Sequence, residues 1–306
     1  STNDAIEGFI GSETVTSTNS STFNDKNVGT GKTVTVNSIT LADGSNGGLA
    51  ANYSISTGQT TTANVTAKPL TVSGITASDK TYDGSVIATM NSSSAVYSGF
   101  VSGDDFAASY SGVFANANVG SGKTVTITSS YSGADVSNYN ITDQTSTTAD
   151  ISAKALTATA STANKTYDGG TTATTTLTFT GLVGSETLGQ TVGSTFDNKN
   201  VGSNKTVTVN SITLADGSNG GLAANYSIST GQTTTANITQ KALTVSGITA
   251  SNKTYDGNAV ATLNTGLVAY SGLVGGDTFN GTYTGAFSDK NVGTGKTVTI
   301  TPSYSG

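Results

Sequence analysis

The chain has 306 residues, of which 13 are basic and 19 are acidic, so that its net charge is −6. It contains no Cys and no His, and all of its basic residues are Lys; this excludes a thiol nucleophile, a Cys/His zinc site and a Ser-His-Asp triad and predicts that the chain is not an enzyme. The acidic balance removes the electrostatic attraction on which nucleic-acid binding depends, and no apolar run is long enough to span a membrane, so we expect no nucleic-acid partner and no membrane span in this segment.

Short motifs recur along the whole chain and divide it into repeats. The string KTYDG occurs at Lys80–Gly84, Lys165–Gly169 and Lys253–Gly257, and NVG occurs at Asn27–Gly29, Asn118–Gly120, Asn200–Gly202 and Asn291–Gly293. A Lys-x-Leu-Thr opening recurs at Lys68, Lys154 and Lys241, with spacings of 86 and 87 residues. The repeat length is therefore about 86 residues, longer than one coil of most solenoids.

Two kinds of repeat alternate. The 32 residues Thr33–Asn64 recur unchanged at Thr206–Asn237, which is 173 positions later, whereas neighbouring repeats are only similar. We predict a partial type A repeat at 1–66, a complete type B repeat at 67–152, a complete type A repeat at 153–239 and a partial type B repeat at 240–306. We expect a longer parent chain at both ends.

The second repeat, residues 67–152, predicts about seven short strands in chain order. Apolar residues alternate with Thr and Ser, and turn signals such as Tyr82-Asp83-Gly84 and Asn118-Val119-Gly120 separate the alternating runs. The expected strands are 70–76, 86–90, 95–99, 106–114, 124–128, 139–142 and 147–151. No segment has a convincing helical period, and the Gly-rich stretch Leu41–Asn52 predicts a loop.

Composition and pattern together predict an all-β protein. Thr makes up about a fifth of the chain, and β-branched residues favour strands. Many short strands with frequent turns are typical of a sandwich, so we expect a tandem array of immunoglobulin-like β-sandwich repeats. The alternatives are β-grasp-like repeats and a β-solenoid.

The motifs KTYDG, NVG-x-GKTVT and NY-x-I, recurring in this order, resemble the YDG-type repeats of giant bacterial surface adhesins, which are exported proteins of the filamentous-haemagglutinin kind. The resemblance extends over essentially the whole chain. One departure is Asn204, which stands where other copies have Gly31 and Gly122. The resemblance implies a long fibre or stalk at the bacterial cell surface, with no catalytic residues.

The repeated Tyr-Asp-Gly motif is the first candidate site. We interpret it as a structural turn, because Asp and Gly both accommodate turn geometry. Its copies are Tyr82, Asp83 and Gly84; Tyr167, Asp168 and Gly169; and Tyr255, Asp256 and Gly257. The competing hypothesis is a calcium site at Asp83, Asp168 and Asp256, although one carboxylate per repeat is a poor supply of ligands for calcium. We otherwise expect no cofactor.

Asp104 and Asp105 form the one pair of adjacent acidic residues. A glycosidase needs two carboxylates that face each other, whereas neighbouring strand residues point to opposite faces. The pair does not recur, since the equivalent site in other repeats contains Ser185-Glu186 or Gly276-Asp277, with one acidic residue each. We interpret it as a solvated turn.

Tyrosines specific to type B repeats are candidate ligand contacts. They are Tyr97, Tyr110 and Tyr131 in the second repeat and Tyr270, Tyr283 and Tyr304 in the fourth. The ordinary interpretation of the same residues is packing in the core or at a sheet edge.

Two functions follow from these observations. The first is a structural stalk or fibre segment of a large secreted or cell-surface adhesin, which gives reach for attachment or biofilm formation. The alternative is a multivalent module that binds glycans or other copies of the fibre weakly through the tyrosines. Both predict an extracellular location, with fibre copies or cell-surface glycans as partners.

Overall fold

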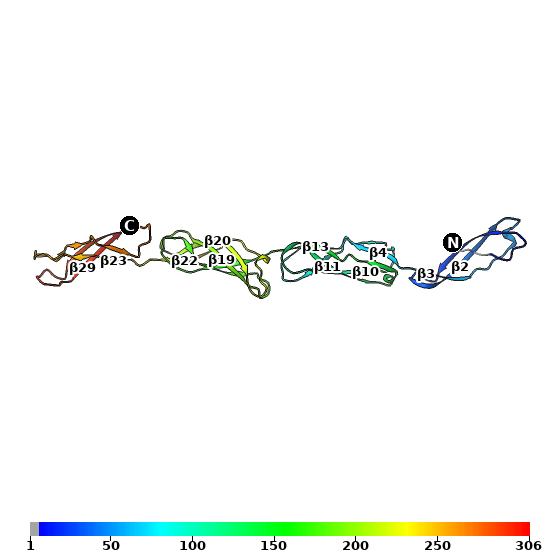
Figure 1. Ribbon diagram of the computed structural model, residues 1–306, viewed down its shortest axis with the longest axis horizontal. Coiled ribbons are helices and arrows are strands. Elements are labelled where there is room, and N and C mark those ends of the chain that lie inside the picture. Colours follow the sequence, from blue (N-terminus) through cyan, green and yellow to red (C-terminus); the bar gives the residue numbers. More distant parts are fainter. Residues whose placement is uncertain (1–5) are drawn as a thin grey trace. The chain divides into compact units, whose positions relative to one another are not determined.

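A computed structural model describes residues 6–306 and contains strands almost throughout (Figure 1). The chain forms two compact units, Ser1–Ser152 and Ala153–Gly306, and each unit holds a type A repeat followed by a type B repeat. The helical segments among the described residues are three 3₁₀ turns, η1 (Ala50–Asn52), η2 (Val136–Asn138) and η3 (Ala223–Asn225). None of residues 6–306 belongs to a helix that could cross a membrane.

Two sheets build the second repeat, in the first unit. One sheet has the strand order β6-β13-β11-β10-β7 and the other the order β12-β4-β9. The strands are β4 (Lys68–Ser73), β6 (Lys80–Thr81), β7 (Ile87–Ala88), β9 (Val96–Ser98), β10 (Ala107–Phe114), β11 (Gly120–Ser132), β12 (Tyr139–Thr142) and β13 (Ser146–Ser152), with β5 (Thr76–Ala77) paired to β8 (Met90–Asn91). Strand β4 runs parallel to β12, and β6 runs parallel to β13. The opening strands of the repeat therefore lie beside its closing strands.

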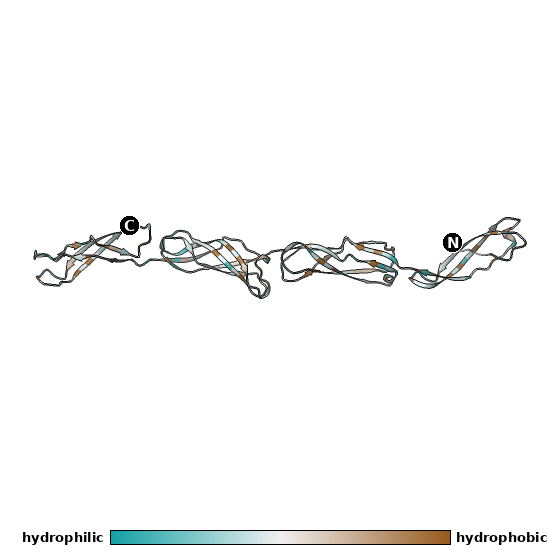
Figure 2. Ribbon diagram, in the orientation of Figure 1, coloured by the Kyte–Doolittle hydropathy of each residue, from teal (hydrophilic) through white to brown (hydrophobic). Residues whose placement is uncertain are grey.

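The core of this repeat lies between the two sheets. Along β11, the buried Val125 and Ile127 alternate with exposed Thr residues, as expected of a strand with one face in the core. Val72 from β4 and Ile127 from β11 belong to one buried cluster, so the cluster draws on both sheets. The strongly hydrophobic residues are few and interspersed with paler ones along the strands (Figure 2). The repeat is a β-sandwich with a thin core.

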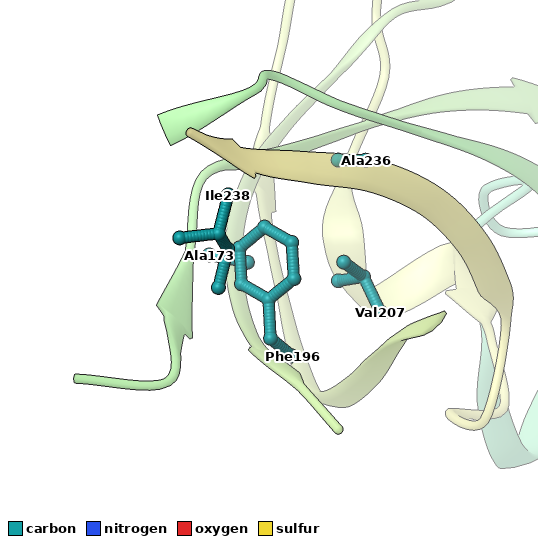
Figure 3. Packing of buried hydrophobic residues seen from close by; sticks show 5 residues of the cluster. All are labelled: Ala173, Phe196, Val207, Ala236 and Ile238. Carbon is teal, nitrogen blue, oxygen red and sulfur yellow. The ribbon is translucent and has the colours of Figure 1, made fainter. Parts of the chain in front are cut away.

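The third repeat, in the second unit, repeats this plan. Its five-stranded sheet has the order β16-β22-β20-β19-β17. The strands are β14 (Lys154–Ala155), β15 (Thr157–Thr162), β16 (Lys165–Thr166), β17 (Thr172–Ala173), β18 (Thr175–Thr180), β19 (Leu188–Phe196), β20 (Gly202–Asp216), β21 (Tyr226–Ser227) and β22 (Thr233–Thr239). Figure 3 shows part of its core, where Phe196 of β19 lies between Val207 of β20 and Ile238 of β22.

The first and fourth repeats contain parts of the same plan. The first has β1 (Val15–Phe23), β2 (Gly29–Asp43) and β3 (Thr60–Val65) in one sheet. The fourth has β25 (Val260–Ala261), β28 (Asn280–Phe287) and β29 (Val298–Ser305) in one sheet, with β23 (Thr244–Ser246) paired to β27 (Ala269–Ser271) and β24 (Thr249–Ala250) paired to β26 (Leu263–Asn264).

The two repeat types differ in their central hairpin. In type A, the pairing of β19 with β20 shifts by one residue after Gly193, and the pairing of β1 with β2 shifts at the equivalent place. The extra residue is Asn210 or Asn37, whose amide donates a hydrogen bond to Thr195 Oγ1 or Thr22 Oγ1. In type B, β10 pairs with β11 without a shift. The divergence between neighbouring repeats therefore includes a β-bulge, which changes local twist.

The prediction of an all-β, tandem β-sandwich array is confirmed. The sheets do not stack as coils of a solenoid. The helical segments of residues 6–306 are 3₁₀ turns, so the helix that the β-grasp alternative requires is absent from the described residues. The strand expected at 139–142 is present with those bounds, and the expected strand at 124–128 extends to Gly120–Ser132. Strand β6 was not predicted, because it has only two residues and pairs with the distant β13.

Candidate functional site

The KTYDG motif forms a loop that its own lysine closes. In the second repeat, Lys80 Nζ donates hydrogen bonds to the carbonyl oxygens of Ser85 at 2.8 Å and Ile87 at 3.2 Å, and it lies 2.7 Å from Asp83 Oδ1. The same nitrogen lies 5.7 Å from the centre of the Phe114 ring. The ammonium group is therefore held by two carbonyls, a carboxylate and an aromatic face.

The rest of the motif shapes the turn. Asp83 Oδ1 also accepts the backbone N–H of Ser85 at 2.8 Å, and Gly84 has a φ of 76°, which favours glycine. Tyr82 is buried, with 4% of its surface exposed, and its N–H donates to the carbonyl of Ser152 at the end of the repeat. The loop is thus attached to the closing strand.

The same contacts recur in both other copies. Lys165 lies 2.7 Å from Asp168, and Lys253 lies 2.8 Å from Asp256, with each ammonium 5.7 Å from the ring of Phe196 or Phe287. Hydrogen bonds from the lysines lower the pKa of both aspartates. Tyr167 and Tyr255 are less shielded than Tyr82, and Gly169 and Gly257 have positive φ values of 81° and 79°.

These contacts bear on the calcium hypothesis. The carboxylates of Asp83, Asp168 and Asp256 each pair with a lysine that supplies the local positive charge. Residues 6–306 contain no group of three or more His, Cys, Asp or Glu side chains placed to hold a metal ion. Calcium binding at these positions stays a prediction, and a calcium ion there would have to displace the lysine.

A second lysine closes the NVG-x-GK loop. In each copy the lysine binds a carboxylate or amide side chain seven positions earlier. The pairs are Lys32 with Asp25, Lys123 with Asn116, Lys205 with Asn198, and Lys296 with Asp289. The φ of Gly31, Gly122 and Gly295 is between 58° and 65°, and Asn204 adopts 51° at the same position. Asn is the side chain that tolerates this conformation best, which explains the departure from Gly.

This loop also joins repeats. In the first unit, Lys26 Nζ lies 2.8 Å from Asp104 Oδ1 and 2.8 Å from Asp135 Oδ2 of the following repeat. The lysine side chain is 61% exposed, whereas the two carboxylate side chains are only 12% and 9% exposed. Hydrogen bonds from Lys26 lower the pKa of both carboxyl groups, and the carboxylates raise the pKa of Lys26. We call this set of contacts the joint.

Backbone and amide groups complete the joint. The N–H of Val28 donates to Asn138 Oδ1 at 2.9 Å, and Asn138 Nδ2 donates to Asn27 Oδ1 at 3.2 Å. The NVG motif of one repeat thus meets the NY motif of the next, and a hollow of about 200 Å³ lies among these residues, lined also by Lys68 and Tyr139. Tyr139 donates its hydroxyl proton to Asp104 at 2.5 Å.

A similar joint lies in the second unit. Lys199 and Asp277, which correspond to Lys26 and Asp104, have a nitrogen–oxygen distance of 3.6 Å. The hydroxyl of Tyr167 donates to the two oxygens of Asp277 at 3.0 and 2.9 Å. The loop and carboxylate at this position therefore meet in both units.

The environment of Asp104 differs from the one expected from the sequence. We expected a solvated turn, but Asp104 accepts hydrogen bonds from Lys26 and Tyr139 and is largely shielded from solvent. The expectation was wrong because Lys26 lies 78 positions away in another repeat. The type A repeats have Glu13 and Glu186 at the position of Asp104, and Ala117 replaces the loop lysine in the second repeat; these differences are the signal that could have indicated the joint.

The candidate ligand-contact tyrosines lie partly inside the fold. Tyr97, Tyr110 and Tyr131 are half-buried and pack against the core cluster that includes Val72 and Ile127. The hydroxyls of Tyr97 and Tyr110 lie 3.1 Å apart, and Tyr131 donates to Asp143. In the fourth repeat, Tyr270 and Tyr283 are half-buried with hydroxyls 2.9 Å apart, and Tyr304 is 48% exposed. Ligand binding by these residues stays a prediction.

A hollow of about 670 Å³ lies in the fourth repeat beside β29. Lys253, Phe287 and Gly293 line it. The corresponding Lys80 and Gly120 pair with Ile151 of β13 in the second repeat, and Lys165 and Gly202 pair with Ile238 of β22 in the third. The hollow therefore lies at the position that β13 and β22 occupy in the second and third repeats.

These features define a tandem-repeat β-protein in which specific side chains join the two repeats within each unit. The family model of the YDG domain matches four stretches, residues 1–63, 66–148, 152–236 and 239–306, so the chain belongs to the YDG domain family. A search of curated proteins and a search of solved structures each find no match.

Proposed function

We propose that the chain is a structural stalk or fibre segment of a large secreted or cell-surface bacterial adhesin, and that it is not an enzyme. The observation that carries the proposal is the joint, in which a loop of one repeat is bonded to the end of the next in both units. Repeats that contact their neighbours in this way add length with every copy.

The proposed location is outside the cell, where the segment would give reach for attachment or biofilm formation. The resemblance of the recurring motifs to repeats of bacterial surface adhesins supports this location. The absence of Cys is compatible with it, since an exported chain must stay unfolded in transit.

Weak multivalent binding of glycans or other fibre copies is the alternative. It has less support, because five of the six candidate tyrosines are half-buried and three of them pack against the core. A binding platform needs exposed rings, as in sites that stack ligands on aromatic faces.

To test the proposal, the 306-residue chain is displayed on a bacterium, between a surface anchor and a binding domain, the head, whose ligand is known. Attachment to the immobilised ligand is compared with that of an unrelated rigid stalk of equal length. A stalk function predicts equal attachment for both displays, and no attachment to glycan-coated surfaces when the head is removed. Attachment without the head would overturn the proposal in favour of binding by the repeats.

A further inference from the structure

The joint contains a pair of positions that differ between the repeats. One is the loop position of Lys26, and the other is the position of Asp135 on the following repeat. We infer that these two positions are complementary and determine which repeat can follow which. The inference concerns recognition between repeats and holds whether or not the array is a stalk.

The joint brings two negative charges and one positive charge together. Asp104 and Asp135 accept hydrogen bonds from the same ammonium group while both are largely shielded from solvent. Two carboxylates this close repel each other unless a cation lies between them. The type B end of the second repeat therefore needs a basic loop from the repeat before it.

The end of a type A repeat has different residues at the positions of the two aspartates. Leu222 and Leu49 stand in the type A repeats where Asp135 stands in type B, and Glu186 stands at the position of Asp104. Glu186 accepts a hydrogen bond from Tyr226 at 2.6 Å, as Asp104 does from Tyr139. The type A end has one carboxylate and a leucine in place of the carboxylate pair.

The residue at the loop position of Lys26 also varies along the chain. The loops that meet a type B end carry Lys26 and Lys199, and the same loop position holds Ala117 in the second repeat and Lys290 in the fourth. Lysine placed against leucine would lose its solvation without gaining a partner, and alanine placed against the two aspartates would leave them unneutralised. Both wrong combinations are therefore unfavourable.

The test uses the complete chain, which has no Cys and so accepts two engineered cysteines for spin labels. Thr40→Cys in β2 and Ser109→Cys in β10 place labels at exposed positions of the first and second repeats. The width of the label–label distance distribution, measured by pulsed electron paramagnetic resonance, reports how firmly the joint is held.

Two single variants should broaden the distribution. Lys26→Met keeps the aliphatic stem and removes the charge, and Asp135→Asn keeps an oxygen acceptor and removes the charge. The unmodified joint should broaden similarly in about 1 M salt, where the Debye length is about 3 Å. Lys290→Met is the matched control, since Lys290 has the same loop position in the fourth repeat and makes no ion pair with residues 6–306.

The decisive variant is the double change Lys26→Ala with Asp135→Leu, which installs the residues found at Ala117 and Leu222. Complementarity predicts a narrower distribution for the double variant than for either Lys26→Ala or Asp135→Leu alone. No broadening in the single variants, no recovery in the double variant, or equal broadening with Lys290→Met would each overturn the inference. Thermal unfolding of every variant identifies any that has lost its fold, and Lys199→Met with labels in the third and fourth repeats then provides the second test.

Discussion

Lys80 and Asp83, three residues apart, form an ion pair of 2.7 Å inside a loop that also gives the lysine two carbonyl acceptors. The side chain of Lys80 is 17% exposed, whereas that of Asp83 is 55% exposed. The lysine is therefore the buried partner, and the carbonyls together with the Phe114 ring supply much of its environment. The loop depends on the lysine more than on the aspartate.

Removal of this lysine tests its structural role. Lys80→Met should destabilise the second repeat by about 2–3 kcal/mol, because hydrogen bonds from a charged group to carbonyls are lost together. Asp83→Asn should cost less, since the exposed partner of an ion pair contributes about 0–1 kcal/mol. Calorimetric unfolding checks both values, and an equal loss for the two variants would contradict the assigned roles.

The joint should loosen in acid. The pKa values of Asp104 and Asp135 are lowered in the folded chain, so the unfolded or separated state binds protons more readily. The stabilisation is therefore present above about pH 4, the ordinary pKa of Asp, and is lost as pH falls through the lowered values. Distance distributions between labels at positions 40 and 109, recorded from pH 6 to pH 3, should broaden at the acidic end. A distribution with the same width at pH 3 would contradict this expectation.

Gly122 offers a test of backbone conformation free of packing effects. It has a φ of 58°, and an added Cβ would meet no atom within 4 Å. Gly122→Ala should therefore destabilise the repeat by about 1–2 kcal/mol through its backbone alone. Gly122→Asn should be tolerated much better, because Asn204 occupies the same position naturally at 51°. Thermal unfolding of the two variants makes the comparison, and an Asn variant as unstable as the Ala variant would refute it.

Tyr97 distinguishes core packing from ligand contact. Because Tyr97 packs against the buried cluster, Tyr97→Ala should cost about 2–4 kcal/mol of stability. Tyr97→Phe keeps the ring and loses only the hydroxyl contact with Tyr110, so it should cost about 1 kcal/mol. Chemical denaturation checks the stability, and glycan arrays with the folded Phe variant check binding. A Phe variant of normal stability that loses glycan binding would support the ligand role.

The hollow in the fourth repeat predicts strand addition. A peptide with the sequence of Ser146–Ser152 should bind beside β29, because the hollow there corresponds to the site of β13. Hydrogen exchange of the amides in residues 293–299, which correspond to the partners of β13 on β11, should slow in its presence. The control peptide carries Lys at the position of Ile151, which is 1% exposed in the second repeat. Equal protection by both peptides would contradict binding in this position.

Much of the fold follows from local pattern. The alternation of apolar residues and Thr predicted the strands of the second repeat, including β12 at Tyr139–Thr142, because one face of each strand is buried. Strand β6 escaped prediction because it has two residues and pairs in parallel with β13, about 70 positions later. Pairing over such a separation leaves no local signal.

The joint also could not be predicted from single motifs. NVG and NY are each recognisable as recurring motifs, but no local pattern connects them, because Val28 and Asn138 lie 110 positions apart. The pair Lys26 and Asp135 is equally remote. The position of Asp135 holds Leu in the type A repeats, and the loop position of Lys26 holds Ala117 in the second repeat. These differences acquire a physical meaning only when the contact is known.

The parallel pairing of β4 with β12 and of β6 with β13 has a mechanical consequence. When a repeat is pulled by its two ends, the force enters through its opening and closing strands, which run in the same direction side by side. The hydrogen bonds between them are then loaded in shear and must break together, whereas an antiparallel hairpin pulled at its open end would unzip one bond at a time. Each complete repeat would therefore resist tension along the chain at its own terminal strands.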